Sequence, residues 1–312
     1  MTPFAFVFPG QGSQAVGMLD AWGDHPEVRR TLEEASAALG EDIGALIKAG
    51  PKDQLDLTTN TQPVMLTAGI ACYRAWIAET GRVPAAAAGH SLGEYTALVA
   101  AGALSLADAL PLVRFRAQAM QEAVPVGAGA MYAILGLDGE AVRAGCAEAA
   151  AASGAAVEAV NFNDPKQTVI AGTKDACAKA AELLKAAGAK RALPLPVSAP
   201  FHSSLMKPAA ERLRDKLAGV SFAPSAFPVV NNIDVAVTDS ADALRDALYR
   251  QAFGPVRWVE VVAALKARGL THIVECGPGK VLAGMVKRID AELQSATIFD
   301  PASLAEARAL LG

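Results

Sequence analysis

A serine between two glycines is the first feature of this sequence that could do chemistry. The segment 88–94 reads Ala-Gly-His-Ser-Leu-Gly-Glu and contains Gly89-x-Ser91-x-Gly93, which is the spacing of a nucleophile elbow. In such an elbow a strand turns sharply into a helix, the serine hydroxyl is exposed at the corner, and the glycines avoid collisions with neighbouring backbone. An ordinary tight turn is the alternative in a chain this rich in alanine and glycine. The spacing makes Ser91 a candidate nucleophile.

A serine nucleophile needs a base to take its proton, and the chain has four histidines. His90 is adjacent to Ser91, so at a sharp turn we expect its ring to point away and pack beside the elbow. His25 lies in an early polar loop, and His272 begins an apolar strand, where a structural histidine is expected. His202 lies in a loop at an expected domain junction, and a serine that precedes its histidine agrees with elbow enzymes. Elimination selects His202 as the base.

The remaining parts of an acyl-transfer site are a group that orients the base and donors for an oxyanion. Elbow hydrolases place an acid between serine and histidine, and Asp164 is the candidate; a backbone carbonyl that holds His202 is the alternative we favour. The elbow supplies the backbone N–H of Leu92, and the glycine turn Gly10–Gln14 can supply that of Gln11. This turn lacks the spacing of a P-loop or of G-x-G-x-x-G, so nucleotide binding has little support.

Hydrophobic patterning predicts the elements that must position these residues. Strands and helices alternate through much of the chain, which indicates an α/β fold with a mainly parallel sheet. The predicted strands are 4–8, 83–88, 130–137, 157–162, 168–172, 191–197, 229–232 and 271–276. The predicted helices are 28–39, 43–49, 61–79, 94–101, 105–122, 139–152, 175–187, 207–218, 241–253, 258–267 and 281–288. The segment 53–60 is polar, and Pro63 is expected in the first turn of its helix.

The order of predicted strands and helices changes after the Pro- and Gly-containing segment 124–129. From there to residue 197 the expected order is β-α-β-β-α-β, which is the ferredoxin-like pattern. We therefore predict an α/β-hydrolase-like large domain with a mainly parallel sheet, formed by residues 1–126 and 198–312. A ferredoxin-like subdomain, residues 127–197, is expected to be inserted into it.

Composition limits the class of protein. The chain has 312 residues, of which 52% are hydrophobic and 19% charged, so a sizeable core is expected. A net charge of −4 argues against nucleic acid as the main ligand. The four cysteines (Cys72, Cys146, Cys177, Cys276) show no metal or disulfide spacing, which favours reduced thiols in a cytoplasmic protein. There is no apolar run of about 18 residues and no signal-peptide pattern, so we expect neither a membrane span nor secretion.

Six segments, in order, resemble the malonyl-CoA:acyl carrier protein transacylases of type II fatty acid synthesis. The resemblance covers essentially the whole chain, and six ordered motifs are far more specific than the elbow alone. They are Gly10-Gln11-Gly12-Ser13-Gln14, Gly89-His90-Ser91-Leu92-Gly93-Glu94, Arg116 with Met120-Gln121, Asn161 with Gln167 and Gly172, Ala199-Pro200-Phe201-His202-Ser203, and Glu275-Cys276-Gly277-Pro278-Gly279.

The resemblance implies transfer of a malonyl group from malonyl-CoA to the phosphopantetheine thiol of holo acyl carrier protein through a malonyl-serine ester. No metal or bound cofactor is implied. Ser91 would be acylated and His202 would act as base. The backbone N–H groups of Leu92 and Gln11 would form the oxyanion hole. The resemblance also implies that the main-chain carbonyl of Gln251 holds the histidine.

Three further positions concern the substrate. Arg116 matches the family position that pairs with the malonyl carboxylate, and a planar guanidinium can bind a carboxylate through two charge-assisted hydrogen bonds. Arg114 is the rival, and its side chain must leave the helix on another face. Asn161 matches a position near the thioester cleft. Leu92 and Phe201 resemble the malonyl-selecting residues, since a bulky Phe201 would crowd a substituent on the α-carbon.

Other functions share some of these motifs. A serine esterase or thioesterase shares the elbow and the base, an acyltransferase domain of a polyketide synthase shares every motif, and a carrier-binding module without catalysis is a third alternative. The length of the chain favours a free-standing enzyme, with a monomer as the default. An acidic carrier protein would need a basic docking patch. The candidates for that patch, each of which could equally be ordinary surface charge, are Lys190, Arg191, Lys280, Lys287 and Arg288.

Overall fold

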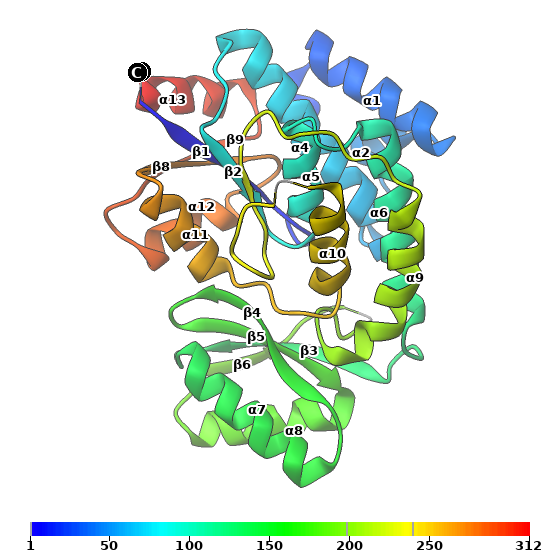
Figure 1. The fold of residues 1–312 in the computed structure, drawn as a ribbon, viewed down its shortest axis with the longest axis vertical. Helices are drawn as coiled ribbons and strands as arrows, with labels where there is room; N and C mark the ends of the chain where they lie inside the picture. Colours follow the sequence, from blue (N-terminus) through cyan, green and yellow to red (C-terminus); the bar gives the residue numbers. More distant parts are fainter. Residues whose placement is uncertain (1, 198, 239) are drawn as a thin grey trace.

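A five-stranded parallel sheet forms the centre of the larger part of the molecule (Figure 1). The computed structural model describes residues 2–197, 199–238 and 240–312. The strand order is β7-β2-β1-β8-β9, and each neighbouring pair is parallel. The strands are β1 (Phe4–Phe8), β2 (Ala86–Gly89), β7 (Val229–Val230), β8 (His272–Cys276) and β9 (Gln294–Ile298). The sheet confirms the predicted α/β class with a mainly parallel core.

The alternation of side chains along β1 divides the core into two layers. Phe4, Phe6 and Phe8 lie in one hydrophobic cluster, whereas Ala5 and Val7 lie in another, as expected when successive side chains point to opposite faces. The first face is covered by α1 (Pro26–Leu39), α2 (Ile43–Ala49), α3 (Lys52–Leu55), α4 (Thr58–Thr80), α5 (Leu92–Ala100), α6 (Leu106–Glu122), α9 (Lys207–Ala218), α10 (Ala241–Gln251) and α13 (Pro301–Leu311). The second is covered by α11 (Trp258–Ala267) and α12 (Val281–Ile289).

The smaller part is a four-stranded antiparallel sheet with two helices on its outer face (Figure 1). Its elements are β3 (Gly129–Leu135), α7 (Gly139–Ser153), β4 (Val157–Asp164), β5 (Gln167–Thr173), α8 (Lys174–Ala186) and β6 (Arg191–Pro194). The strand order β4-β5-β3-β6 is the ferredoxin-like arrangement that the sequence predicts. The division at 126/127 and 197/198 stays a prediction, and residue 198 lies outside the described residues.

The inner face of the small sheet packs against the large part through apolar side chains. Met131, Val160 and Ala171 of the sheet share one hydrophobic cluster with Met120 of α6 and with Phe201. This apolar contact joins the two parts next to the loop that carries His202. The position of the small sheet therefore defines one wall of the space above Ser91.

Several element boundaries differ from the prediction. Part of the polar segment 53–60 is helical: α3 ends at Leu55 and α4 begins at Thr58. The early start of α4 places Pro63 inside this helix rather than in its first turn. The pattern of the sequence predicts no element for residues 294–311, where the structure has β9 and α13. The sequence of β9, Gln-Ser-Ala-Thr-Ile, lacks an apolar run because this strand lies at the edge of the sheet.

In the described part of the chain, no helix combines the length and the apolar character that crossing a membrane requires. The four cysteines are buried as free thiols. Burial raises the pKa of Cys72 to about 12, and burial also raises the pKa of Cys276. These thiols are therefore protonated and unreactive at neutral pH.

The two elbow glycines are required by close approach of backbone. A Cβ atom on Gly93 would lie 2.0 Å from the carbonyl oxygen of Phe8, and one on Gly89 would lie 1.9 Å from the carbonyl carbon of Gly93. Both distances are far below van der Waals contact, and the atoms that would be struck belong to buried backbone. The Gly-x-Ser-x-Gly spacing therefore permits β1, β2 and α5 to meet.

We expect the substitution Gly93→Ala to lower the free energy of unfolding by about 3 kcal/mol or more, because the clash is with β1 itself. The measurement is thermal unfolding, with an expected fall in Tm of at least about 5 °C. Gly284→Ala in α12 is the matched control, since its Cβ would meet only the end of the Arg288 side chain, at 3.4 Å. That control is expected to be neutral or to stabilise by up to about 1 kcal/mol. Equal Tm values for the two variants would contradict this explanation of the elbow.

Candidate active site

Ser91 lies at the corner between β2 and α5, where the sequence places the elbow. Its backbone has φ 53° and ψ −109°, a conformation that a residue with a side chain adopts only under strain. The side chain of Asn232 holds this corner. Its Oδ1 accepts the N–H of Ser91 at 2.7 Å, and its Nδ2 donates to the carbonyl of Gly89 at 2.7 Å. One amide therefore satisfies both sides of the turn.

His202 is the histidine that reaches the serine. The Ser91 hydroxyl donates to Nε2 of His202 at 2.7 Å, and Nδ1 of His202 donates to the main-chain carbonyl of Gln251 at 2.9 Å. A carbonyl can only accept, so it fixes the proton on Nδ1 and leaves Nε2 free to act as a base. Asp164, the alternative acid, instead accepts from Nε of Arg288 at 2.7 Å. The geometry thus has a carbonyl in the place where hydrolases have a carboxylate.

The imidazole of His202 is held in its neutral form. The side chain is buried, with 4% of its surface exposed. Burial, together with the positive charge of Arg116, lowers the pKa of His202 to about 3. Both causes disfavour the charged ring. At neutral pH the ring is therefore unprotonated and able to accept a proton.

Arg116 extends from α6 into the same place. Its Nη2 donates to the Ser91 hydroxyl oxygen at 3.1 Å and to Oε1 of Gln251 at 3.0 Å, while Nη1 donates to Oε1 of Gln62 at 2.8 Å. Only 2% of its surface is exposed. Its rival Arg114 makes a two-point ion pair with Glu41 on the outside of the molecule. Arg116 is therefore the arginine that the structure brings to the nucleophile.

A cavity of about 130 Å³ opens above Ser91. Its lining combines apolar side chains with the serine, the histidine and the arginine. The predicted residues Gln11, Leu92, Asn161 and Phe201 all line it. The complete lining is Gln11, Gln62, His90, Ser91, Leu92, Arg116, Met120, Met131, Asn161, Leu195, Val197, Phe201 and His202. Gln251 is fully buried beneath these residues.

The glycine turn after β1 lies against the elbow. A Cβ on Gly10 would be 2.6 Å from the carbonyl oxygen of His90, so the two backbones touch. Gln11 and Leu92 consequently lie on the wall of one small cavity. This is the arrangement expected if the two backbone N–H groups are to converge on one oxygen atom.

The other three histidines have structural contacts. His90 is paired through Nε2 with Oδ1 of Asn163 at 2.8 Å and packs against the ring of Trp258, although it also lines the cavity. His25 caps the N-terminus of α1. His272 lies at the start of β8, where Nδ1 pairs with the hydroxyl of Thr271. Among the described residues, no three His, Cys, Asp or Glu side chains are grouped so that they could hold a metal ion.

Sequence reasoning missed three polar residues at the site: Gln62, Glu94 and Asn232. They contact Arg116, Gln251 and the elbow, respectively. The local signal for two of them is a polar residue in a buried helix: Gln62 is buried near the start of α4, and Glu94 follows the elbow on the buried helix α5.

The comparisons with known proteins agree with this geometry. The family model described as "Acyl transferase domain" matches residues 5–299. The malonyl CoA-acyl carrier protein transacylase of Escherichia coli K12 is 53% identical over 98% of this chain and 99% of its own length. That of Bacillus subtilis 168 is 45% identical, covering 97% and 96% of the two chains.

Solved structures give the same result. A crystal structure of an acyl-carrier-protein S-malonyltransferase from Burkholderia pseudomallei 1710b matches with a TM-score of 0.96 and 67% identity, over 98% of this chain and 99% of that one. A malonyl-transacylase in complex with a type II polyketide synthase acyl carrier protein matches with a TM-score of 0.96 and 50% identity, over the same shares. Family, sequence and fold agree along the chain, which therefore belongs to the malonyl CoA-acyl carrier protein transacylases of the acyl transferase family.

Proposed function

We propose that this chain moves a malonyl group from malonyl-CoA to acyl carrier protein, with Ser91 carrying the group between the two thiols. The observation that carries this proposal is that one atom, Oγ of Ser91, is contacted by both Nε2 of His202 and Nη2 of Arg116. A base and a carboxylate-binding cation meet at one nucleophile. A simple esterase needs only the first of them.

In the first step His202 takes the proton from the Ser91 hydroxyl as Oγ attacks the thioester carbonyl of malonyl-CoA. The oxyanion that forms is stabilised by the backbone N–H groups of Leu92 and Gln11. The C–S bond then breaks, and the proton on His202 passes to the leaving coenzyme A thiolate. A malonyl-serine ester remains.

In the second step the phosphopantetheine thiol of the holo carrier protein enters. His202 removes its proton, the thiolate attacks the ester carbonyl, and the Ser91 oxygen leaves with the proton that His202 returns. Bonds and protons balance without a redox partner. We therefore propose that no cofactor is needed and that malonyl-CoA is a substrate.

Arg116 gives the site its preference for a malonyl group. Nη2 contacts the Ser91 oxygen in the free enzyme, and Nη1 has a second N–H beyond the one that it gives to Gln62. A carboxylate on the acyl group can take both positions, forming the two-point pair that a guanidinium favours. The buried setting makes this pairing strong, because water does not compete for it.

We also propose that the enzyme works as a cytoplasmic monomer and that an acidic carrier protein docks on basic residues near the cleft. The side chains of Lys190, Arg191, Lys280 and Lys287 are exposed. Arg288 is paired with Asp164, which weakens its candidacy. Asn161 lines the cavity at the small sheet, in the place where the thioester arm would pass.

The test is to mix the protein with radiolabelled malonyl-CoA and holo acyl carrier protein. Label on the carrier protein is the expected result. Label released as free malonate would show a hydrolase instead. No consumption of malonyl-CoA would favour a binding module without catalysis.

The pH profile offers a separate prediction. Because His202 in the free enzyme has a pKa of about 3, it stays in its basic form throughout the range above that value. We therefore expect kcat/KM for malonyl-CoA to stay level between pH 8 and about pH 5, rather than to halve near 6.5, the pKa of an ordinary histidine. The measurement is kcat/KM at each pH, with circular dichroism as the control for folding. A tenfold fall per pH unit beginning at 6.5 would show that burial does not set this pKa.

Phe201 leads to a prediction about which substituents the α-carbon of the acyl group can carry. The ring forms part of the cavity wall and is 9% exposed, so a methyl group on the α-carbon of the acyl group would crowd it. We expect kcat/KM for methylmalonyl-CoA to be about 100-fold below that for malonyl-CoA, and Phe201→Ala to raise it about tenfold. Steady-state kinetics with both thioesters decides the matter. Comparable kcat/KM values in the unmodified protein would refute the steric role.

A further inference from the structure

A buried carboxylate lies directly behind the nucleophile. Glu94 belongs to the first turn of α5, three residues after Ser91, and only 2% of its surface is exposed. Its Oε2 accepts the backbone N–H of Asn232 at 2.8 Å and Nε2 of Gln251 at 3.0 Å. The proposed mechanism gives this carboxylate no task, although it is among the most deeply buried acidic groups of the chain.

Gln251 connects Glu94 to the working groups of the site. Its Nε2 donates to Glu94 and also to the carbonyl of Ser91 at 3.0 Å, and its Oε1 accepts from Nη2 of Arg116 at 3.0 Å. Its main-chain carbonyl holds His202. A single residue therefore touches the nucleophile, the arginine and the base.

The orientation of the Gln251 amide matters because its two ends differ. The NH₂ end only donates and the oxygen end only accepts. Burial raises the pKa of Glu94 to about 7, but its Oε2 accepts from Asn232 and Gln251 in either protonation state, and a guanidinium only donates. With Glu94 on one side and Arg116 on the other, one orientation satisfies both neighbours. The flipped orientation would set oxygen against carboxylate and NH₂ against guanidinium.

We propose that Glu94 is a positioning residue that fixes the Gln251 amide and thereby keeps Arg116 aimed at the acyl carboxylate. The inference rests on the proposed function of Ser91 and Arg116. It adds a buried group that supports the preference for malonyl-CoA without contacting the substrate. Glu94 touches neither substrate nor reacting atom. It acts through Gln251.

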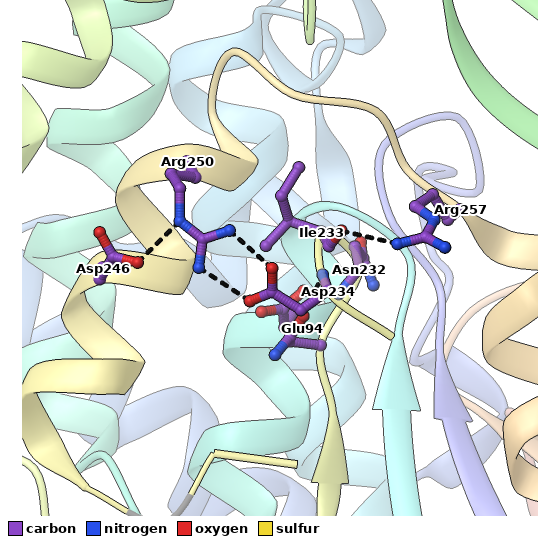
Figure 2. A network of polar contacts seen from close by, with 8 residues as sticks. Glu94, Asn232, Ile233, Asp234, Asp246, Arg250 and Arg257 are labelled. Atoms are coloured by element: carbon purple, nitrogen blue, oxygen red, sulfur yellow. Dashed lines mark hydrogen bonds and ion pairs between the residues drawn. The ribbon is translucent and has the colours of Figure 1, made fainter. Parts of the chain in front are cut away.

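Ion pairs around Glu94 fix the positions of the two segments that donate hydrogen bonds to it. Figure 2 shows Glu94 beside Asn232, with Asp234 of the same loop bound by Arg250, which also reaches Asp246. Arg250 precedes Gln251 on α10, so its two-point pair with Asp234 ties the end of this helix to the loop that carries Asn232. Two segments that both donate to Glu94 are thereby fixed relative to each other.

The test is a double-mutant cycle with Glu94→Ala, Gln251→Ala and both together. Transfer to holo acyl carrier protein is measured with malonyl-CoA and with acetyl-CoA, which has no carboxylate. We expect Glu94→Ala to lower kcat/KM for malonyl-CoA about 10- to 100-fold, mainly through KM, and that for acetyl-CoA less than about threefold. The double variant should have the same kcat/KM for malonyl-CoA as Gln251→Ala, because both changes remove the same hydrogen-bonded support of Arg116.

Conservative variants separate positioning from mere structure. Glu94→Gln keeps an acceptor oxygen for both donors and should recover most of the malonyl transfer that Glu94→Ala loses. Glu275→Gln is the matched control, since this carboxylate is equally buried but accepts the N–H of Ala283 in the first turn of α12. It should lower Tm without changing the malonyl-to-acetyl ratio.

Multiplying losses in the cycle, or equal losses with both thioesters, would overturn the positioning role. If Glu94→Ala does not fold, Glu94→Asp replaces it in the same cycle, because it keeps a carboxyl group but withdraws it by one methylene group. The unmodified protein is measured in the same assay. A failed positioning role is therefore distinguished from a failure of the proposed function, which would appear as absent malonyl transfer by the unmodified chain.

Discussion

Replacing Ser91 by alanine is expected to lower malonyl transfer by about 10⁴-fold or more and to abolish the acyl-enzyme. The oxygen of Ser91 is the atom that forms the malonyl ester. Among the described residues that line the cavity, no other hydroxyl shares its contacts with His202 and Arg116. The measurement has two parts: steady-state transfer to holo carrier protein, and the mass of the intact protein after brief exposure to malonyl-CoA. The unmodified protein should gain the mass of one malonyl group, and the variant none.

His202→Ala is the companion to this experiment. It should lower transfer about 10³-fold or more, while the double variant should be no slower than Ser91→Ala alone, because the two residues act as one unit. The backbone strain at Ser91 does not depend on the hydroxyl, so Ser91→Ala should fold with a Tm close to that of the unmodified chain. A malonyl adduct on the Ser91→Ala protein would show that another residue is the nucleophile.

The parts of the site that were predictable from sequence are those set over short distances. The glycines at 89 and 93 are demanded by contacts within the elbow and with β1, so the spacing alone indicates the geometry. His202 could be found because the chain offers few histidines and the other three lie in settings typical of structural roles. The strand-helix alternation likewise predicted the strands of both sheets except the edge strand β9, which has no apolar run.

The parts that were not predictable depend on contacts between distant segments. Any residue can offer a main-chain carbonyl, so the role of Gln251 followed from the family resemblance and not from its side chain. The sequence predicts the two arginines of α6 on different faces, but which of them turns inward depends on Glu41 and Gln62, which are far away in the sequence. Glu94 meets Gln251 across 157 positions, and no local pattern encodes such a contact.

Arg116→Lys is expected to lower kcat/KM for malonyl-CoA about 10²- to 10³-fold and to change that for acetyl-CoA little, so the preference between the two thioesters collapses. A lysine keeps the positive charge, but a single ammonium cannot present the planar pair of donors that a carboxylate accepts. It also cannot reach Gln62, Gln251 and Ser91 together, as the guanidinium does. Removing one partner of a buried, hydrogen-bonded charge pair costs about 2–5 kcal/mol, which agrees with a 10²- to 10³-fold loss of kcat/KM.

Arg114→Lys provides the control for this experiment, since it lies on the same helix two residues earlier and pairs with Glu41 at the surface. A surface ion pair contributes little, so this variant should transfer malonyl within about twofold of the unmodified protein. Kinetics with both thioesters on both variants separates selection from general damage. Equal losses for malonyl-CoA and acetyl-CoA in Arg116→Lys would mean that the arginine serves the nucleophile and not the carboxylate, and the malonyl preference would then have to come from the cavity wall formed by Phe201 and Leu92.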